Sequence, residues 1–283
     1  MLIKKKLNNN TIITKNKQNQ EIIVVGKGVG YGKNIHDLID ESKVAKIFVP
    51  ENKGERKKIL DMVDQIPIEF INISKQIISY ARRKYELVLN ESVYITLTDH
   101  IYSSIDRFKE GIILKNKFQW EIRNFYPNEF KIGEKGLEII KKEFGIELGE
   151  DEASFIAMHV ISSEIGGDME DFYEQTSFIQ QTTNIVKYYF STDFDEDSLD
   201  YYRFVTHLKF FWHRITRDKN KKMQDMENDI LEIIKNKRVE AYLCSLKVKQ
   251  FIEKNYQYEL TNEEILYLTI HISRMTQKLP MEE

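Results

Sequence analysis

Hydrophobic residues in the N-terminal part of the chain stand in short runs rich in β-branched side chains, a pattern typical of strands. Residues 11–14 and 21–25 are two such runs, separated by the polar, turn-like residues 15–20. Residues 44–49 form a third run. The pattern predicts a small antiparallel all-β domain over residues 1–55. A few short strands make a poor core alone, so we expect a homodimer that covers the open sheet edges.

The rest of the chain carries apolar residues at helical spacing. Residues 51–66 are a charged segment that turns helical, and we expect a linker at residues 56–66. All-α helical bundles are then expected at residues 67–168 and 172–283, joined at the glycine-containing residues 165–171.

The two helical parts repeat each other, which decides the architecture. At an offset of 107, the first part matches the second at Tyr94/Tyr201, Thr98/Val205, His100/His207 and Arg107/Arg214. At an offset of 112, it matches again at Glu152/Glu264, Phe155/Tyr267 and His159/His271. Each offset is constant within its block, so the pattern indicates a duplicated domain with a small insertion. The predicted fold is therefore multidomain: a small antiparallel all-β N-terminal domain followed by two homologous all-α helical-bundle domains.

Composition limits the classes of protein that fit. The length of 283 residues allows two or three domains, and the single cysteine, Cys244, excludes an internal disulfide. No apolar run is long enough to cross a bilayer, and the N-terminal lysines are not followed by the apolar stretch of a signal peptide. We therefore expect a cytoplasmic protein without membrane insertion.

Charge is distributed unevenly along the chain. The first 33 residues contain seven lysines and one acidic residue, a charge of +6, although the whole chain carries -3. The remaining residues therefore carry -9. A basic N-terminal region on an acidic body favours a polyanionic partner, while the alternative is a solvated, lysine-rich surface.

Four of the six histidines occupy equivalent places in the two repeats: His100, His159, His207 and His271. Arg107 and Arg214 follow the first histidine of each repeat by seven residues, so on a helix they share its face. A histidine at the rim of a buried face, near an arginine, suits a group that accepts a phosphoryl anion, because arginine pairs with phosphate in a bidentate way. Each histidine alone has a second interpretation as a satisfied core residue, but four at equivalent positions favour function.

Metal binding is the rival chemistry for these histidines. Close spacings such as HxxxH are absent, and the six-residue interval between His207 and His213 suits chelation on a helix poorly. A P-loop, a serine nucleophile elbow and a dinucleotide fingerprint are also absent. We therefore expect no enzyme activity, no metal site and no cofactor. His36 and His213 have no repeat partner and are interpreted as surface or packing residues, and Thr261 with Glu264 forms a predicted capping box.

Motifs along essentially the whole chain resemble the BglG/SacY/LicT family of transcriptional antiterminators, with β-glucoside antiterminators as the closest likeness. The N-terminal motifs resemble the co-antiterminator (CAT) RNA-binding domain: Ile3, Lys5, Leu7-Asn8-Asn9-Asn10, Gly26-Lys27-Gly28, Tyr31 and Lys33. The repeats resemble phosphotransferase system (PTS) regulation domains, or PRDs. The motifs that carry this second likeness are Leu97-Thr98-Asp99-His100, Asp151-Glu152-Ala153, Tyr202-Arg203-Phe204-Val205-Thr206-His207 and Tyr267-Leu268-Thr269-Ile270-His271.

The resemblance implies a function for each domain. A dimer of the first domain would bind an RNA hairpin, the ribonucleic antiterminator, in nascent mRNA of a sugar operon and so block an overlapping terminator. A sugar-specific PTS enzyme II would phosphorylate His100 and His159, which inactivates the protein. The phosphocarrier HPr would phosphorylate His207 and His271, which favours the active dimer. Residues expected to support the phosphate sites are Asp99, Arg107 and Arg214.

Side-chain chemistry in the first domain agrees with RNA binding. Asn8 and Asn10 carry amide donors and acceptors, and Tyr31 can stack on an unpaired base. Gly26 and Gly28 let the backbone come close to a partner. The lysines expected to neutralise phosphates are Lys5, Lys27 and Lys33. Structural interpretations stand beside these, because asparagine also favours turns and Tyr31 can pack in a dimer.

Two positions depart from the family pattern. Lys27 and Tyr31 stand where the resemblance leads us to expect Arg and Phe. Lysine lacks the planar fork of arginine, so a different target preference is expected. Two other functions compete with RNA binding: a phosphorylation-controlled regulator whose target is DNA or protein, and a histidine phosphotransfer relay. The stranded, basic N-terminal region favours RNA over both.

Overall fold

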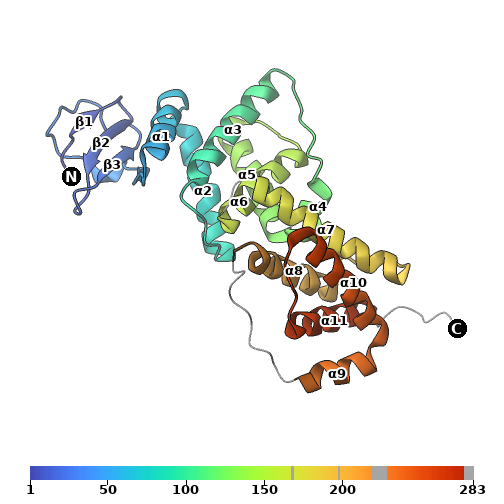
Figure 1. Cartoon of the computed structure of the whole chain (residues 1–283). Helices are drawn as coiled ribbons and strands as arrows, with labels where there is room; N and C mark the ends of the chain where they lie inside the picture. The colour runs from blue at the N-terminus through green and yellow to red at the C-terminus, as the bar shows by residue number, and fades with distance from the viewer. Residues whose placement is uncertain (167–168, 197, 218–227, 277–283) are drawn as a thin grey trace. The chain divides into compact units, whose positions relative to one another are not determined.

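The computed structural model describes residues 1–166, 169–196, 198–217 and 228–276 (Figure 1). The chain divides into two compact units, one made of residues 1–122 and 127–169, the other of residues 123–126 and 170–283. The first unit begins with a small antiparallel sheet, and helices make up most of both units. The predicted fold class, an all-β domain followed by two all-α bundles, is confirmed.

The sheet has four antiparallel strands in the order β1-β2-β3-β4. They are β1 (Lys5–Lys6), β2 (Thr11–Lys15), β3 (Glu21–Val25) and β4 (Lys46–Phe48). The two central predicted strands are confirmed, whereas the third is shorter than the predicted residues 44–49, because only three residues pair with β3. Strand β1 was not predicted, since two polar residues give no strand pattern.

A polar turn closes the β2–β3 hairpin, as its composition predicts. The side-chain oxygen of Asn16 accepts hydrogen bonds from the backbone N–H groups of Gln18 and Gln20, at 2.9 and 3.0 Å. Asn19 adopts a left-handed conformation with φ of 62°, which asparagine tolerates better than most residues. The turn fixes the register that pairs Ile13 with Ile23.

Both faces of the sheet are buried, which explains why β3 is a continuous apolar run. Side chains alternate between the faces of a strand. One face packs against loops of its own domain in a cluster of Ile3, Ile12, Ile22, Val24, Val29 and Ile39. The other face contributes Ile13, Ile23, Val25 and Phe48 to the large core that includes the following helices.

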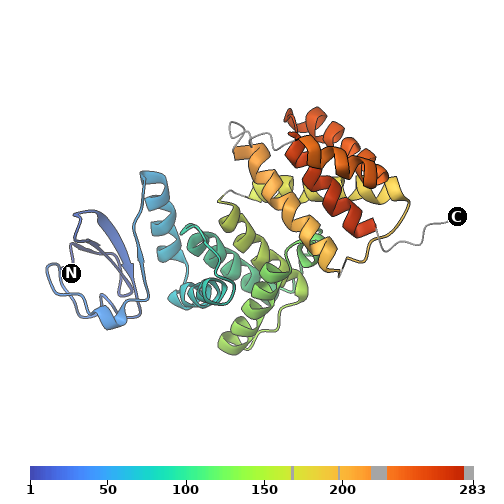
Figure 2. The same cartoon turned by 90° about the horizontal axis from the view of Figure 1, so that it is seen from below.

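Helix α1 (Lys53–Gln65) forms from the predicted charged connector and lies beside the sheet (Figure 2). Asn52 caps its start, because its side-chain oxygen accepts a hydrogen bond from the N–H of Glu55 at 2.9 Å. The buried face of the helix presents Ile59, Met62 and Val63 to the core. The connector is therefore a packed structural element of the first unit.

Residues 68–165 contain five helices: α2 (Ile68–Tyr85), α3 (Val93–Lys109), α4 (Gln119–Phe125), α5 (Pro127–Phe144) and α6 (Glu150–Ile165). The described residues from 169 to 276 contain five more: α7 (Met169–Phe190), α8 (Leu199–Arg217), α9 (Asn228–Lys237), α10 (Val239–Tyr256) and α11 (Asn262–Thr276). Helices α5 and α10 begin 112 residues apart, as do α6 and α11. The structure thus bears out the predicted duplication and puts the five-residue insertion between α8 and α10.

The predicted joint between the repeats coincides with the end of one helix and the start of the next. Helix α6 ends at Ile165, and Gly166 follows in a left-handed conformation with φ of 71°. Glycine adopts this conformation without strain and commonly ends helices. Gly167 and Asp168, also part of the predicted joint, lie outside the described residues.

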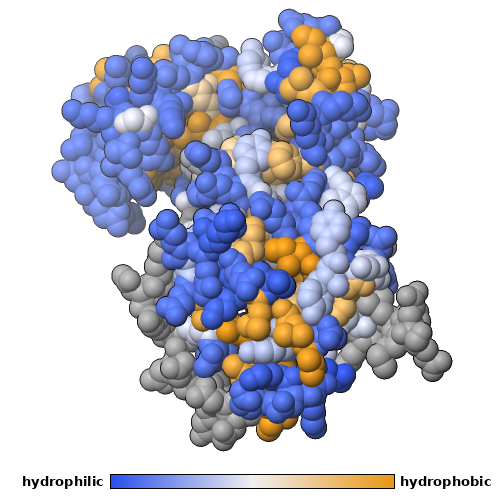
Figure 3. Space-filling view, turned by 45° about the vertical axis from the view of Figure 1, so that its right-hand side comes forward, coloured by the Kyte–Doolittle hydropathy of each residue, from blue (hydrophilic) through white to orange (hydrophobic). Residues whose placement is uncertain are grey.

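Polar side chains predominate on the face of the molecule drawn in Figure 3, and hydrophobic ones gather in separate patches. Among the residues that the structure describes, no helix combines the length and the apolar character needed to span a bilayer.

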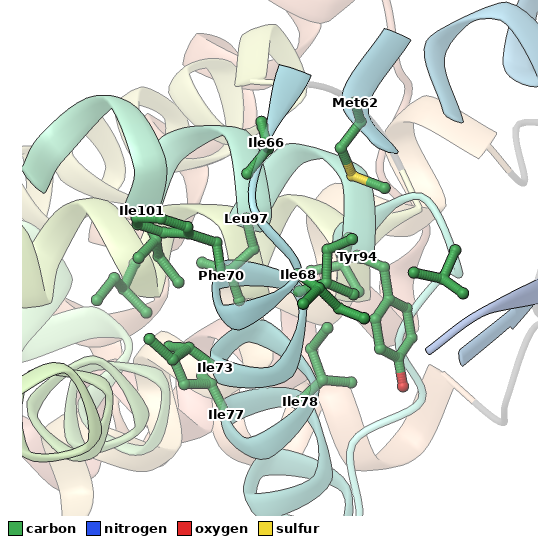
Figure 4. Close-up of a cluster of buried hydrophobic side chains, with 14 of the residues drawn as sticks. Met62, Ile66, Ile68, Phe70, Ile73, Ile77, Ile78, Tyr94, Leu97 and Ile101 are labelled. Carbon is green, nitrogen blue, oxygen red and sulfur yellow. The ribbon is translucent and has the colours of Figure 1, made fainter. Parts of the chain in front are cut away.

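The core of the first unit is built mainly from isoleucine. Figure 4 shows Ile68, Ile73 and Ile77 of α2 in a cluster with Leu97 and Ile101 of α3, all fully or almost fully buried. Along α2, Phe70, Ile73 and Ile77 recur at intervals of three and four residues, and the α3 pair is four residues apart, so each helix turns one apolar face inward. Close packing of that face fixes the orientation of α3, and His100 lies at the edge of the same face.

Candidate phosphorylation sites and RNA-binding surface

The first histidine pair joins α3 to α6. The rings of His100 and His159 lie 4.8 Å apart, centroid to centroid. His100 Nε2 is 3.0 Å from Glu152 Oε2, and both side chains are only 12% exposed. Two histidines far apart in the sequence, predicted to act together, are therefore neighbours at a largely shielded site.

Arg107 reaches this site through Glu152. Its guanidinium lies 3.7 Å from Glu152 Oε1, and its Nε is buried without a hydrogen-bond partner among the described residues. Sequence spacing had predicted Arg107 on the His100 face of the helix, and the structure adds the carboxylate that connects them. Asp99, the fourth predicted residue, is exposed.

Burial sets the charge of His159. Burial, together with the nearby His100, lowers the pKa of His159 from 6.5 to about 3. A neutral imidazole keeps a lone pair on one ring nitrogen, and this lone pair is what a phosphoryl acceptor needs. At neutral pH, His159 is therefore in the state required of an acceptor.

The second histidine pair joins α8 to α11 in the same way. The rings of His207 and His271 are 4.0 Å apart, and Tyr267 stacks 6.0 Å from His207. Burial is the largest cause of the lowered pKa of both histidines. The positive charge of Arg214 also lowers the pKa of His207. The neighbouring His207 also lowers the pKa of His271, which falls to about 4. The second bundle thus repeats the first in holding two imidazole rings together.

The glutamates of the two sites differ in their partners. Glu264 accepts hydrogen bonds from the hydroxyl of Tyr258 at 2.8 Å and from the N–H of Thr261 at 3.0 Å. Thr261 Oγ1 in turn accepts from the N–H of Glu264 at 3.3 Å, so the predicted capping box is confirmed. Arg214 Nε lies 3.3 Å from Glu264 Oε1, without the geometry of a hydrogen bond.

The first bundle lacks the groups that hold Glu264. At the offset of 112, Tyr258 and Thr261 correspond to Ile146 and Gly149, neither of which has a polar side chain. The carboxylate of Glu152 contacts His100 instead. Sequence reasoning missed this contact, although Glu152 precedes His159 by seven residues, an interval that places both on one helix face.

Two loops of the small domain, residues 7–10 and 26–33, are bound to each other. Asn10 Oδ1 accepts a hydrogen bond from the N–H of Gly28 at 2.8 Å, and its backbone oxygen accepts from the N–H of Gly26 at 2.9 Å. Asn8 Oδ1 accepts from the N–H of Asn10 at 2.8 Å. The predicted asparagines therefore build the loop pair through their side-chain oxygens.

Glycine is required in this loop pair for two different reasons. A Cβ on Gly26 would lie 1.9 Å from the backbone oxygen of Lys43, so any side chain there would displace the backbone. Gly28 has a φ of +67°, in the region that favours glycine. Close packing therefore holds the loop in place. Three side chains of the predicted surface are exposed, Lys5, Lys27 and Tyr31, and Tyr31 is 70% exposed, whereas Lys33 is half-buried.

Comparison with known proteins agrees with this division of the chain. A family model described as CAT RNA binding domain matches residues 1–57, and one described as PRD domain matches residues 75–163 and 180–275. "Transcription antiterminator LicT" of Bacillus subtilis (strain 168) is 41% identical over 278 residues, which cover 98% of this chain and 100% of the relative. The "Beta-glucoside operon antiterminator" of Dickeya chrysanthemi is 36% identical over 279 residues, 99% of this chain and 98% of the relative.

A solved structure is also similar. The crystal structure of GlcT CAT-PRDI is 33% identical, with a TM-score of 0.51, and the match covers 58% of this chain and 97% of that one. The full-length relatives, the two family models and the paired histidines lead to one conclusion. The chain belongs to the BglG/SacY/LicT family of transcriptional antiterminators, in which a CAT RNA-binding domain precedes two PRDs.

Proposed function

We propose that this chain binds an RNA hairpin in the nascent mRNA of a β-glucoside operon and prevents its termination, under the control of histidine phosphorylation. The observation that carries the proposal is the pair of neighbouring histidines at equivalent places in two bundles, on a chain that begins with a CAT domain. The name of one full-length relative, the "Beta-glucoside operon antiterminator" of Dickeya chrysanthemi, supports the sugar class.

The loop pair of the small domain is the proposed RNA-binding surface. Lys5, Lys27 and Lys33 supply positive charge to phosphates, and the exposed ring of Tyr31 offers a surface on which an unpaired base can stack. The other members are Asn8, Asn10, Gly26 and Gly28, whose hydrogen bonds and close packing give the loops a fixed shape. A fixed shape reduces the ordering cost of binding.

The four histidines are the proposed phosphoryl acceptors. A ring nitrogen attacks phosphorus, and the bond from phosphorus to the donor breaks as the N–P bond forms. In each bundle an arginine Nε without a hydrogen-bond partner lies near the pair, on Arg107 and Arg214. A phosphoryl oxygen on the neighbouring histidine would accept from these groups.

The proposed partners follow from the family. A β-glucoside-specific enzyme II acts on His100 and His159 and inactivates the protein, and HPr acts on His207 and His271 and favours an RNA-binding homodimer. The protein is a regulator in this scheme, with no reaction of its own to catalyse. The working domain limits are residues 1–55, 67–168 and 172–283.

Binding to a leader hairpin with two internal loops tests the proposal. Full-length protein is titrated with this hairpin and with a scrambled hairpin of equal length across a salt series. We expect selective binding to the first hairpin that persists at moderate salt, and its loss in Tyr31→Ala. Equal affinity for both RNAs would show nonspecific attraction to phosphate and would overturn the RNA-recognition part of the proposal.

A further inference from the structure

The last turn of α3 and the loop after it carry four exposed apolar side chains, which we call the apolar cap: Phe108, Ile112, Ile113 and Leu114. Ile113 is 73% exposed, more than any other isoleucine among the described residues. Figure 3 shows hydrophobic side chains gathered at the top of the view, where this turn ends the molecule. Such a group of exposed apolar side chains usually marks a contact with another molecule.

Hydrogen bonds connect the apolar cap to α3 and α6, the two helices that carry the first histidine pair. The N–H of Ile112 donates to the backbone oxygen of Arg107 at 2.9 Å, which keeps the cap close to the end of α3. The far end of the turn is fixed to α6, because the N–H of Asn116 donates to Asp151 Oδ1 at 2.8 Å. Asp151 immediately precedes Glu152, the partner of His100.

The second repeat has a different sequence at these positions. At the offset of 107, Ile112, Ile113 and Leu114 correspond to Lys219, Asn220 and Lys221, and at the offset of 112 they correspond to Gln224, Asp225 and Met226, all outside the described residues. At either offset, three apolar residues of the first repeat stand against mostly polar residues of the second. The histidines of the two repeats are alike, so a feature that separates their phosphoryl donors has to lie outside the histidine pairs.

A protein that phosphorylates His100 must bring its own phosphorylated side chain against this histidine. Surfaces around the two reacting groups then touch, and the apolar cap stands at the end of the helix that carries His100. Four partly exposed side chains offer only a few hundred Å², whereas each partner in a stable complex buries about 800 Å². The cap therefore suits a short-lived complex better than a dimer of this chain.

We propose that the apolar cap is the docking surface of the protein that phosphorylates His100, and that this donor carries an apolar rim around its phosphorylated side chain. The proposal rests on the proposed function, because it assumes that His100 is an acceptor. It adds the part of the surface that lets the first bundle discriminate between the two phosphoryl donors.

Phosphoryl transfer to the full-length chain tests the docking surface. Ile113→Asp is compared with Val88→Asp, a change at another exposed apolar residue of the first unit, whose side chain is 86% exposed. Both variants and the unsubstituted chain are prepared in two forms. One form keeps only His100 and His159 of the four candidate histidines, and the other keeps only His207 and His271. The probes are the phosphorylated soluble domain of a β-glucoside-specific enzyme II and phosphorylated HPr.

We expect Ile113→Asp to slow transfer from the enzyme II domain by at least tenfold, with transfer from HPr and all rates in Val88→Asp unchanged. Unchanged transfer from the enzyme II domain in Ile113→Asp would overturn the docking proposal alone. If Ile113→Asp lost its dimer in sedimentation but kept its transfer rate, the docking proposal would also be wrong, and the apolar cap would be a contact between two copies of this chain. No transfer to unsubstituted His100 from either donor would overturn the proposed function itself.

Discussion

At the scale of residues, the two histidine sites differ most in one carboxylate. Glu152 lies 3.0 Å from His100 Nε2, whereas Glu264 is held by Tyr258 and Thr261. A phosphoryl group on His100 would bring a second anion to Glu152, and like charges at this distance repel strongly in a shielded site. The first site therefore opposes its own phosphorylation more than the second does.

Replacing the carboxylate tests this difference. We expect Glu152→Gln to shift the phosphorylation equilibrium of His100 toward the phosphorylated form by about tenfold, or about 1.4 kcal/mol, because the amide keeps the shape and removes the charge. Phosphorylation is measured at fixed ratios of phosphorylated to free donor. Glu264→Gln serves as the matched control in the second bundle, where we expect loss of stability and little change at His207. A shift of equal size in both variants would contradict the argument.

The lowered pKa of His271 predicts a pH dependence of stability. Its folded-state pKa is about 4 and its unfolded value is 6.5, so between these values the unfolded chain binds more protons. This contribution to stability is fully present above pH 6.5 and is lost as the pH falls toward 4. Urea unfolding of His271→Asn should therefore show a smaller decrease in the free energy of unfolding across this window than the unsubstituted chain. An identical decrease would mean that His271 is not shielded.

At the scale of elements, the two loops of the small domain act as one unit. Asn10 makes the connection, because both its side-chain and backbone oxygens accept hydrogen bonds from the glycine loop. An exposed lysine such as Lys27 adds charge without holding the loops together. The two kinds of residue should thus affect RNA binding in different ways.

We expect Asn10→Ala to weaken hairpin binding and to destabilise the small domain by about 1–3 kcal/mol, because the N–H of Gly28 loses its acceptor. Lys27→Ala should leave stability unchanged and lower the slope of log affinity against log salt by about 0.9 for the lost phosphate contact. Both quantities come from thermal unfolding and salt-dependent titration of the same preparations. A stable Asn10→Ala with unchanged affinity would show that the loops keep their shape without this bond.

Sequence patterns predicted those elements whose signal is local. Runs of β-branched residues predicted β2 and β3. The sequence repeat predicted both histidine pairs, and the structure places the members of each pair side by side. Strand β1 and the contact of Glu152 with His100 were missed. The first is too short to carry a pattern, and the second depends on which side chains stand at Ile146 and Gly149. These missed features arise from tertiary packing, which no single stretch of sequence encodes.

At the scale of the whole molecule, regulation requires the bundles to change what the RNA-binding domain does. One face of the sheet shares a core with α1 and the first bundle, so the small domain is in direct contact with a regulatory part of the chain. A charge added to a bundle has a physical route to the sheet through this packing.

Double substitutions that mimic phosphate test the coupling. We expect His207→Asp with His271→Asp to increase dimer formation and to tighten hairpin binding by at least tenfold, and His100→Asp with His159→Asp to weaken it. Sedimentation and RNA titration on the full chain measure both effects. If neither dimerisation nor affinity changed in the first pair, the proposed coupling would be wrong.

Under the proposed function, the carboxylate at His100 would also give the two sites different sensitivities to the supply of phosphoryl groups. A site that contains its own competing anion fills only when donor is abundant, and it empties first when donor declines. A site whose glutamate is held elsewhere fills at a lower supply. In the proposed scheme, if the supplies to both donors fell together, inhibition at the first bundle would be relieved before activation at the second was lost.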